Sequence, residues 1–432
     1  MNIKSKLQEV DKEHYQLLTD IGRVAREEEL KVYLVGGMVR DLLLNIDNLD
    51  IDIVVEDNAL RLANALTKKF SSCEINAKHD RFHTAKLIFE INKKKIPIDL
   101  ASTREETYDF PAALPKVSVS ELKKDLLRRD FTINALAISL LPDDFGEIVD
   151  LFQGLEDLKN KKIRILHDKS FIDDPTRMIR AIRFACKLGF EIESHTKKIL
   201  EGAINSKQFD NLIEKIRGDR VKIEIRYLLN LSNIEEAVKA FFNSGIYRMV
   251  STDLNPCRVV INSDSTNISP SRQWLIYLAI VIKDLNPDNQ EKIMKNLQMT
   301  GDEIKVITDG FNTFNELKEK QLIDSVVIYN ELKNLTAESI SILQLLTRVE
   351  TPCQGVSTQR INDLIKEYLE KTSKIKLEIT GQDLISMGIK EGKKIGEILE
   401  KILELKIKNP LLKKDDEIKE VKKIISSDSL IL

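Results

Sequence analysis

KVYLVGGMVRDLLLNIDNLDIDIVV, residues 31–55, contains the pattern that decides the fold of the N-terminal part of the chain. Its first five residues are a short apolar run that ends at two glycines, and helical spacing of apolar residues resumes over 38–44. Its last six residues begin by alternating aspartate with isoleucine, as a half-buried strand does. This order predicts a strand, a glycine turn, a helix and a second strand.

The two glycines, Gly36 and Gly37, and the arginine that follows, Arg40, have the chemistry of a phosphate site. Glycines between a strand and a helix let backbone N–H groups approach an anion at the positive end of the helix. A guanidinium adds a planar fork that binds phosphate oxygens. By itself a Gly-Gly turn with a surface arginine is an ordinary connection, so the interpretation depends on the strand that comes next.

Asp50 and Asp52 begin that strand and predict a metal site. Side chains two residues apart in a strand share a face, so both carboxylates project together while Ile51 and Ile53 turn to the buried side. Paired carboxylates suit Mg²⁺, and beside a phosphate site they match the needs of phosphoryl transfer. The metal activates the attacking hydroxyl and neutralises the leaving pyrophosphate. The alternative is a solvated acidic strand end.

The patterns on either side of this unit divide the chain into two parts. Helices are predicted at 13–29 and 59–70, strands at 83–90 and 96–101, and a helical stretch at 120–141 closes an α/β region. Beyond it the strand patterns almost vanish, and long amphipathic helices dominate. The predicted helices that follow span residues 174–188, 193–203, 210–230 and 234–244.

Composition limits the class of protein. A chain of 432 residues exceeds a single hydrophobic core, so two to four compact units are expected. No apolar run is long enough for a signal peptide or a membrane span, so we expect a cytoplasmic protein without a membrane partner. The four cysteines lack C-x-x-C spacing, which argues against a disulfide framework or a structural zinc site. The net charge of −2 means that any RNA-binding surface must be local.

Further motifs follow the glycine turn and the aspartate pair in a fixed order. They are RRDFTINALA (128–137), Asp150-Leu151 with Gly154, DDPTRMIRAIRF (173–184) and LGF (188–190). With them the chain resembles the class II tRNA nucleotidyltransferases and bacterial poly(A) polymerases, a family of the polymerase-β-like superfamily.

The resemblance implies roles for individual residues. Asp50 and Asp52 are expected to be the catalytic residues that hold a Mg²⁺ cofactor. Asp130 and Asn134 are expected one turn apart on a helix, where both can face the ribose and phosphates. Asp99 occupies about the place of a third carboxylate, although a lone aspartate at a strand end is usually solvated. The predicted nucleotide-binding residues are Gly36, Gly37, Arg40, Arg129, Asp130, Asn134, Asp174, Arg177, Arg180 and Arg183.

The resemblance also assigns the reading of the incoming base to Asp174 and Arg177, which with Arg180 and Arg183 are expected to step along one helix. Cytosine and adenine each present an amino donor beside a ring-nitrogen acceptor, whereas uracil and guanine present a carbonyl beside an N–H group. An aspartate acceptor next to an arginine donor matches the first pattern and leaves unpaired groups against the second. The alternative is an i,i+3 ion pair on a solvated face.

The implied fold class is α+β, with a polymerase-β-like nucleotidyltransferase α/β head followed by an all-α neck, body and tail. The segment 218–224, GDRVKIE, resembles the family motif that braces the base-reading helix, with Asp219 where glutamate is commoner. The expected domains are a catalytic head at 1–141, a neck with base recognition at 142–230, a body at 231–350 and a tRNA-binding tail at 351–432.

The implied activity is template-independent addition of CMP, CMP and AMP, from CTP and ATP, to the 3′ end of tRNA with release of pyrophosphate. A-adding enzymes, CC-adding enzymes and poly(A) polymerases share these motifs. Residues 101–117, ASTREETYDFPAALPKV, indicate a mobile loop. Its presence argues against CC addition alone, but it also looks like loops of A-adding relatives, so A addition is the main alternative.

Two other classes fit the sequence less well. A small-molecule nucleotidyltransferase would share the glycine turn and the aspartate pair, but it would need neither the motif at 173–184 nor the long helical part. An RNA-binding module without catalysis would be expected to have lost Asp50 or Asp52, and both are present.

Overall fold

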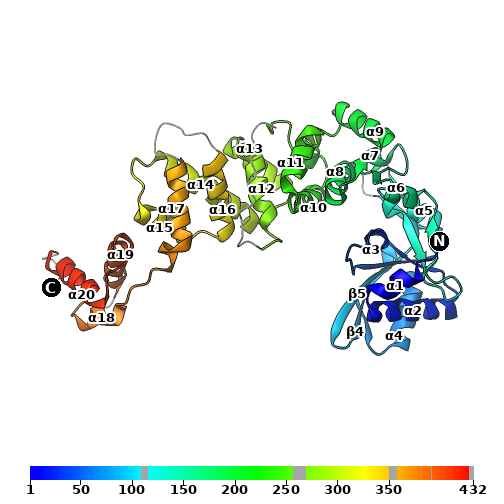
Figure 1. Cartoon of the computed structure of the whole chain (residues 1–432), viewed down its shortest axis with the longest axis horizontal. Coiled ribbons are helices and arrows are strands. Elements are labelled where there is room, and N and C mark those ends of the chain that lie inside the picture. Colours follow the sequence, from blue (N-terminus) through cyan, green and yellow to red (C-terminus); the bar gives the residue numbers. More distant parts are fainter. Residues whose placement is uncertain (109–114, 256–268, 350–357, 391, 428–432) are drawn as a thin grey trace. The chain divides into compact units, whose positions relative to one another are not determined.

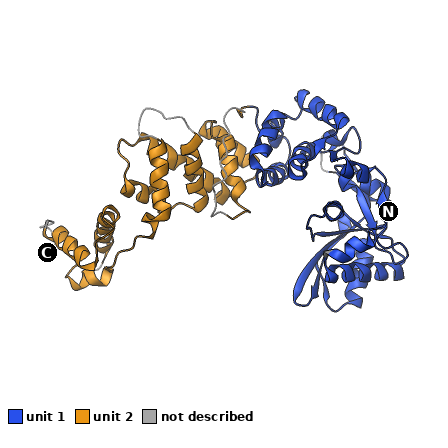
Figure 2. Ribbon diagram, in the orientation of Figure 1, with its two compact units in different colours: residues 1–252 blue, residues 253–432 orange. Residues whose placement is uncertain are grey.

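The computed structural model forms two compact units, residues 1–252 and residues 253–432, which are blue and orange in Figure 2. The sequence predicts a finer division, into head, neck, body and tail, and that division stays a prediction. The structure describes residues 1–108, 115–255, 269–349, 358–390 and 392–427.

A seven-stranded mixed sheet forms the N-terminal part of the first unit, and helices follow it (Figure 1). Among its described neighbours only β2 and β5 run parallel, and the other pairs are antiparallel. The sheet and the helices that follow it confirm the predicted α+β class. In spatial order the strands are β3 (Cys73–His79), β4 (Thr84–Ile91), β5 (Lys94–Ser102), β2 (Ile51–Val55), β1 (Val32–Val35), β8 (Leu136–Ser139) and β9 (Ile148–Asp150).

The predicted strand–turn–helix–strand unit consists of β1, α3 (Gly37–Leu43) and β2. Alternation along β5 shows which face of the sheet is covered. Ile96, Ile98 and Leu100 are buried, whereas Asp99 between them is exposed. Helix α4 (Ala59–Lys69) contacts β3, β4 and β5, and it buries its leucines there. The face that carries Asp99 is the opposite one.

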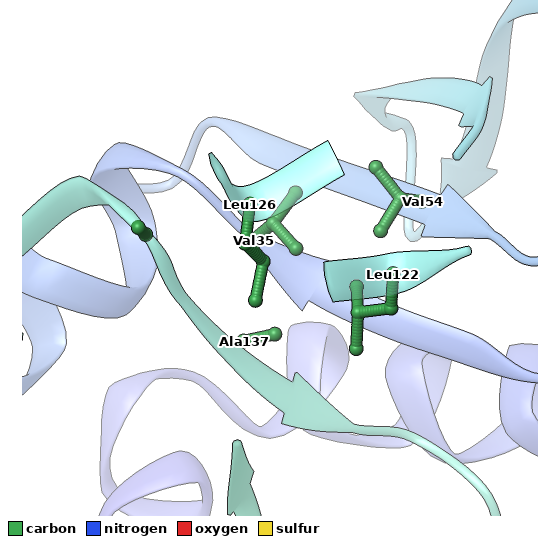
Figure 3. Packing of buried hydrophobic residues seen from close by; sticks show 6 residues of the cluster. Val35, Val54, Leu122, Leu126 and Ala137 are labelled. Atoms are coloured by element: carbon green, nitrogen blue, oxygen red, sulfur yellow. The ribbon is translucent and has the colours of Figure 1, made fainter. Parts of the chain in front are cut away.

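Helix α5 (Leu122–Leu127) covers part of that opposite face. Its Leu122 and Leu126 pack with Val35, Val54 and Ala137 of the sheet (Figure 3). The aspartate two residues before Val54 in β2 lies on the same face and remains exposed. The helix therefore leaves open the part of the face where the metal site was predicted.

The prediction of a helical stretch over 120–141 is wrong. The chain there forms α5, the 3₁₀ helix η2 (Thr132–Asn134) and strand β8, which lies between β1 and β9. All four residues of β8 are buried. A short and mostly apolar run shows no clear alternation of apolar and polar residues, so the pattern does not distinguish a buried strand from a buried helix.

Most other predicted helices of the first unit are present with ends shifted by a few residues, but the helix predicted at 210–230 begins only at residue 218, after a 3₁₀ turn at 212–214. Two short strands, β10 (Lys162–Ile163) and β11 (Glu191–Ile192), form a separate parallel pair, and β6 (Arg104–Thr107) and β7 (Lys116–Val119) form a hairpin. The helices are α1 (Lys4–Val10), α2 (Lys12–Glu27), α6 (Gly154–Lys159), α7 (Ser170–Asp173), α8 (Thr176–Leu188), α9 (Ser194–Asn205), α10 (Gly218–Leu229) and α11 (Ile234–Asn243), with 3₁₀ turns η1 (Asp80–Phe82), η3 (Leu212–Glu214) and η4 (Ile246–Met249).

The described part of the second unit is helical. Cys73 and Cys186 are free thiols in the first unit, and Cys257 and Cys353 lie outside the described residues. Within the described residues, no helix is long and apolar enough to cross a membrane. The helices of the second unit are α12 (Gln273–Ile282), α13 (Pro287–Asn296), α14 (Gly301–Glu319), α15 (Ser325–Leu332), α16 (Ala337–Val349), α17 (Thr358–Glu370), α18 (Gly381–Ser386), α19 (Lys393–Lys408) and α20 (Lys414–Ser427), with a 3₁₀ turn η5 (Thr372–Lys374).

Helix α2 approaches the chain after β8 so closely that a methyl group does not fit between them. A Cβ atom on Gly22 would lie 1.7 Å from the carbonyl oxygen of Leu140. We expect Gly22→Ala to destabilise the first unit by about 3 kcal/mol, because the backbone itself must move. Thermal unfolding followed by circular dichroism measures the loss.

Gly202→Ala is the matched control for this prediction. Gly202 lies in α9, and a Cβ atom there would meet nothing within 4 Å. Alanine in a helix interior is favoured over glycine by roughly 0.5–1 kcal/mol, so this variant should unfold at the same or a higher temperature. Equal unfolding temperatures for the two variants would contradict the close approach of α2.

Candidate functional site

A cavity of about 840 Å³ in the first unit collects the residues that the sequence predicts for the site. They come from β2, α3, α8 and the segments around α5 and η2, which are far apart along the chain. All of them line this one cavity, whereas their individual roles stay predictions. These residues are Gly36, Gly37, Arg40, Asp50, Asp52, Arg129, Asp130, Asn134, Asp174, Arg177, Arg180 and Arg183.

Gly36 lets the turn after β1 pass close to the carboxylate of Asp52. Its φ of 82° lies in the left-handed region that side chains disfavour. A Cβ atom at this position would lie 3.0 Å from Oδ2 of Asp52 and 3.8 Å from Nη1 of Arg129. Both the backbone and the space therefore require glycine. A Cβ atom on Gly37 would make only ordinary contacts, so packing alone does not require the second glycine.

Asp52 lies near two other carboxylates, those of Asp50 and Asp99. Although its side chain remains solvent-exposed, partial desolvation by the surrounding protein raises the pKa of Asp52. The carboxylates of Asp99 and Asp50 raise it as well, whereas Arg129 opposes them. The parallel pairing of β2 with β5 places Asp52 and Asp99 directly opposite each other. A divalent cation stabilises carboxylates that are held together in this way.

Asp50 and Asp52 provide the oxygen ligands that Mg²⁺ prefers. Among the residues that the structure describes, no group of three or more His, Cys, Asp or Glu side chains could hold a metal ion. Mg²⁺ is usually bound by one or two carboxylates together with substrate phosphates, so a pair of aspartates fits such an ion. Asp99 lies 3.6 Å from Nζ of Lys86 and lines an adjoining cavity of about 420 Å³.

Arg40 is engaged with protein side chains. Its Nε donates to Oδ1 of Asp41 at 2.7 Å and its Nη1 to Oδ1 of Asn134 at 2.7 Å, and only 3% of the residue is exposed. Asn134 donates in turn to Oδ1 of Asp130 at 2.9 Å. Arg40 thus fixes the polar side chains below the turn, and contact with a phosphate stays a prediction for it.

Two predicted helical arrangements are wrong. Asp130 precedes the short η2 that ends at Asn134, so the two do not lie on one regular helix, although a hydrogen bond joins them. Asp174 has an extended backbone (φ −135°, ψ 93°) and precedes α8, which contains Arg177. The physical reason lies in Pro175, because the residue before a proline is disfavoured in the helical region.

Both carboxylate oxygens of Asp174 are held in place. Oδ1 accepts hydrogen bonds from the backbone N–H (3.1 Å) and the hydroxyl (2.6 Å) of Thr176, at the start of α8. Oδ2 lies 2.8 Å from Nη2 of Arg220, in α10. Asp174 therefore points into the cavity in one fixed orientation, and Arg220 is a cavity residue that no single-residue prediction named.

Arg177 does not pair with Asp174, so the alternative of a surface ion pair between them is wrong. It is 5% exposed, its Nη1 donates to Oγ of Ser170 at 2.8 Å, and its Nη2 donates to the carbonyl oxygen of Arg128 at 2.6 Å. These bonds connect α8 to α7 and to the end of α5. The arginine is held rigidly in the first turn of α8, where it lines the cavity.

Glu224 in α10 binds the two remaining arginines of α8. Arg180 donates from Nη1 to Oε1 of Glu224 at 2.8 Å, and Arg183 donates from Nε to Oε2 at 2.9 Å. Arg180 also donates from Nε and Nη2 to Oδ2 of Asp130, at 2.9 and 2.5 Å. Although burial acts to raise it, the charge of Arg180 holds the pKa of Asp130 below its usual range. The resemblance of 218–224 to a bracing motif is the signal for this contact.

A second acidic group, which the sequence analysis missed, lies under Arg128 and Arg129. Asp125 is fully buried, and its Oδ1 and Oδ2 lie 2.7 and 3.1 Å from these arginines. Glu106 in β6 accepts from Nη1 of Arg128 at 3.1 Å and from the hydroxyl of Tyr108 at 2.9 Å. Two consecutive arginines at a partly buried position favour nearby carboxylates, and this is the sequence feature that could have indicated Asp125 and Glu106. Residues 109–114 of the predicted mobile loop lie outside the described residues.

Two family models match the chain in separate stretches. Residues 32–164 match the poly A polymerase head domain, and residues 267–421 match a putative tRNA nucleotidyltransferase domain 2. The first stretch includes the glycine turn, both aspartates and the arginine pair. The second lies in the helical part, and it carries none of the predicted catalytic residues.

Curated relatives include A-adding tRNA nucleotidyltransferases. The one from Geobacter sulfurreducens is 31% identical over 93% of this chain and 46% of its own length. The one from Aquifex aeolicus is 34% identical over 86% of this chain and 44% of its own length. The chain therefore spans about half the length of these two relatives.

Solved structures match the chain from end to end. The apo form I of a CCA-adding enzyme is 32% identical, with a TM-score of 0.75 over 98% of this chain and 97% of the other. The Thermotoga maritima CCA-adding enzyme complexed with tRNA is 29% identical, with a TM-score of 0.74 over 98% and 99%. Identity at this level over nearly the whole length of both chains, together with the two domain matches, shows that the chain belongs to the family of tRNA nucleotidyltransferases.

Proposed function

We propose that this chain adds the nucleotides C, C and A, from CTP and ATP, to the 3′ end of tRNA without a nucleic-acid template. One observation carries the proposal: a single cavity holds an aspartate pair, a glycine turn and a fixed Asp174 beside Arg177. The first two suit the transfer of a phosphoryl-linked group. The last can distinguish bases, so the protein itself would replace a template.

The residues of the cavity divide the work. Mg²⁺ held by Asp50 and Asp52 would activate the attacking 3′ hydroxyl and neutralise the leaving pyrophosphate. Backbone N–H groups after the turn at Gly36, at the N-terminus of α3, bind the triphosphate. Arg129, whose guanidinium lies near both the turn and Asp52, adds positive charge for the phosphates.

Asp174 is suited to accept a hydrogen bond from the amino group of cytosine or adenine. Thr176 occupies both acceptor sites of Oδ1, but Oδ2, which Arg220 binds, has a second acceptor site. Uracil and guanine would face this acceptor with a carbonyl oxygen, which cannot donate. The unpaired buried acceptors would disfavour both bases.

We expect Asp174→Asn to lower the preference for C and A over U and G by about tenfold to a hundredfold, because the amide can donate to a carbonyl. Single-nucleotide incorporation with each of the four triphosphates measures the preference. Asp173→Asn is the control, since Asp173 is the last residue of α7 and does not line the cavity. An unchanged preference in Asp174→Asn would exclude base reading by this residue.

Addition of A alone is the second candidate, because the two curated relatives above are named as A-adding enzymes, whereas the solved structures are named as CCA-adding. Purified chain is incubated with tRNAs that end before CCA, after C and after CC, with CTP, ATP or both, and the products are sequenced. Complete CCA on the shortest tRNA is the expected result. Addition of A to the longest tRNA without incorporation of C elsewhere would establish the second candidate instead.

A further inference from the structure

Two large apolar side chains of α10 line the cavity that holds the two aspartates. Ile223 and Tyr227 in α10 line the cavity, one turn apart on the same side of the helix. They are 49% and 54% exposed. Single exposed apolar residues are common on protein surfaces, but two neighbours that face a largely charged cavity form a defined apolar surface.

This surface is separated from the base-reading residue along α10. Arg220, which binds Asp174, and Tyr227 both line the cavity and are seven residues apart, which corresponds to about 10 Å along the helix. Stacked bases of one strand are about 3.4 Å apart. A base that contacts Asp174 therefore does not also cover Tyr227. Ile223 lies about 4.5 Å from Arg220 along the helix, roughly one stacking interval, so the apolar surface is available to the adjoining base.

Arginine and lysine surround the apolar surface. The Arg183 guanidinium lies 5.3 Å from the ring centroid of Tyr227 and 4.4 Å from that of Phe184. This sandwich leaves Arg183 8% exposed and keeps the tyrosine ring in place. Lys187, one turn further along α8, lines the same cavity and is exposed. An aromatic ring beside cations matches a nucleotide, which has a flat base and a charged phosphate.

We propose that Tyr227, together with Ile223, stacks against the terminal base of the tRNA acceptor strand. This inference rests on the proposed function, in which a second nucleotide must lie beside the incoming one. The ring takes the base face without reading its edge, so it serves A and C alike. Lys187 contacts the adjoining phosphate of the RNA. The incoming triphosphate remains on Asp174 and the glycine turn.

Steady-state kinetics separate the two substrates. With the full chain and saturating CTP and ATP, Tyr227→Ala should raise the KM for tRNA about tenfold, since stacking of one base contributes about 1–3 kcal/mol. The KM for each triphosphate at saturating tRNA should change less than about twofold. Tyr227→Phe retains the ring and should restore the wild-type KM for tRNA. Ile172→Ala, at an exposed isoleucine of α7 outside the cavity, is the control.

A binding experiment gives a readout that is independent of transfer. A tRNA with 2-aminopurine as its last base should lose fluorescence on the wild-type chain and regain it on Tyr227→Ala. Equal quenching by both chains, or a rise in the KM for triphosphate without one for tRNA, would overturn the inference. A wild-type chain that quenches the probe but transfers no nucleotide would overturn the proposed function and leave the stacking surface intact.

Discussion

Asp52→Asn is expected to lower nucleotide transfer about a thousandfold or more, because it removes a charged oxygen ligand from the proposed metal site. The same change should leave the chain folded. Partial desolvation and the nearby Asp99 and Asp50 raise the pKa of Asp52, so its ionised form opposes folding. We therefore expect the asparagine variant to unfold at the same or a slightly higher temperature at neutral pH.

The stability difference between Asp52→Asn and the wild type should depend on pH with a definite sign. An aspartate with a raised pKa in the folded state destabilises the fold at neutral pH, and protonation removes the effect as the pH falls through the raised value. The difference in unfolding temperature between the variant and the wild type should therefore shrink toward acidic pH. Product formation on a tRNA acceptor measures the transfer, and calorimetry at several pH values measures the stability.

Asp99→Asn is the matched control for this experiment. Asp99 pairs directly with Asp52 in the sheet, but it lies in the adjoining cavity near Lys86. With two metal ligands, this variant should lose less than about tenfold in transfer. A loss as large as that of Asp52→Asn would show that the site uses three carboxylates, and an active Asp52→Asn would refute the proposed metal site.

Glu224→Ala is expected to destabilise the first unit by about 3–5 kcal/mol. Glu224 is 5% exposed and binds Arg180 and Arg183, so its removal leaves the buried charge of Arg183 without its carboxylate, whereas Arg180 keeps Asp130. Transfer should fall as well, because α8 loses its attachment to α10. Chemical denaturation followed by circular dichroism, together with the transfer assay, measures both effects.

Glu235→Ala provides the comparison, since this glutamate also forms an ion pair but lies on the surface. It pairs with Lys239 at 2.6 Å in α11, and both side chains are more than half exposed. Such pairs contribute little, so we expect a change below about 0.5 kcal/mol. Equal losses of stability in the two variants would show that the contact of Glu224 with α8 stabilises the fold no more than a surface ion pair does.

Local motifs predicted the site better than the course of the backbone. The glycine turn and the aspartate pair lie in adjoining elements, so their proximity followed from strand geometry. Strand β8 was mistaken for a helix because an apolar run between two strands has no period. The identity of its neighbours, β1 and β9, is a long-range pairing that no local pattern contains.

Local sequence patterns also do not predict the partners of the charged side chains. The i,i+3 spacing suggested that Asp174 would meet Arg177, yet Pro175 keeps Asp174 out of the helix and Arg220 binds it from α10. Arg40 is bound by its neighbour Asp41 and by the distant Asn134, which no local pattern indicates, and its contact with a phosphate stays a prediction. These contacts depend on the packing of α3, α8 and α10, which follows from the tertiary fold.

The parallel pairing of β2 with β5 has a consequence for the charge of the site. Asp99 lies between the buried Ile98 and Leu100, so a shift of β5 by one residue would turn the aspartate toward α4 and expose both apolar side chains. The shift is disfavoured by the hydrophobic effect alone. The burial of Ile98 and Leu100 on one face of the sheet therefore fixes the position of the Asp99 charge on the other face. Substitutions in that core can change the electrostatic potential at the site without contacting a substrate.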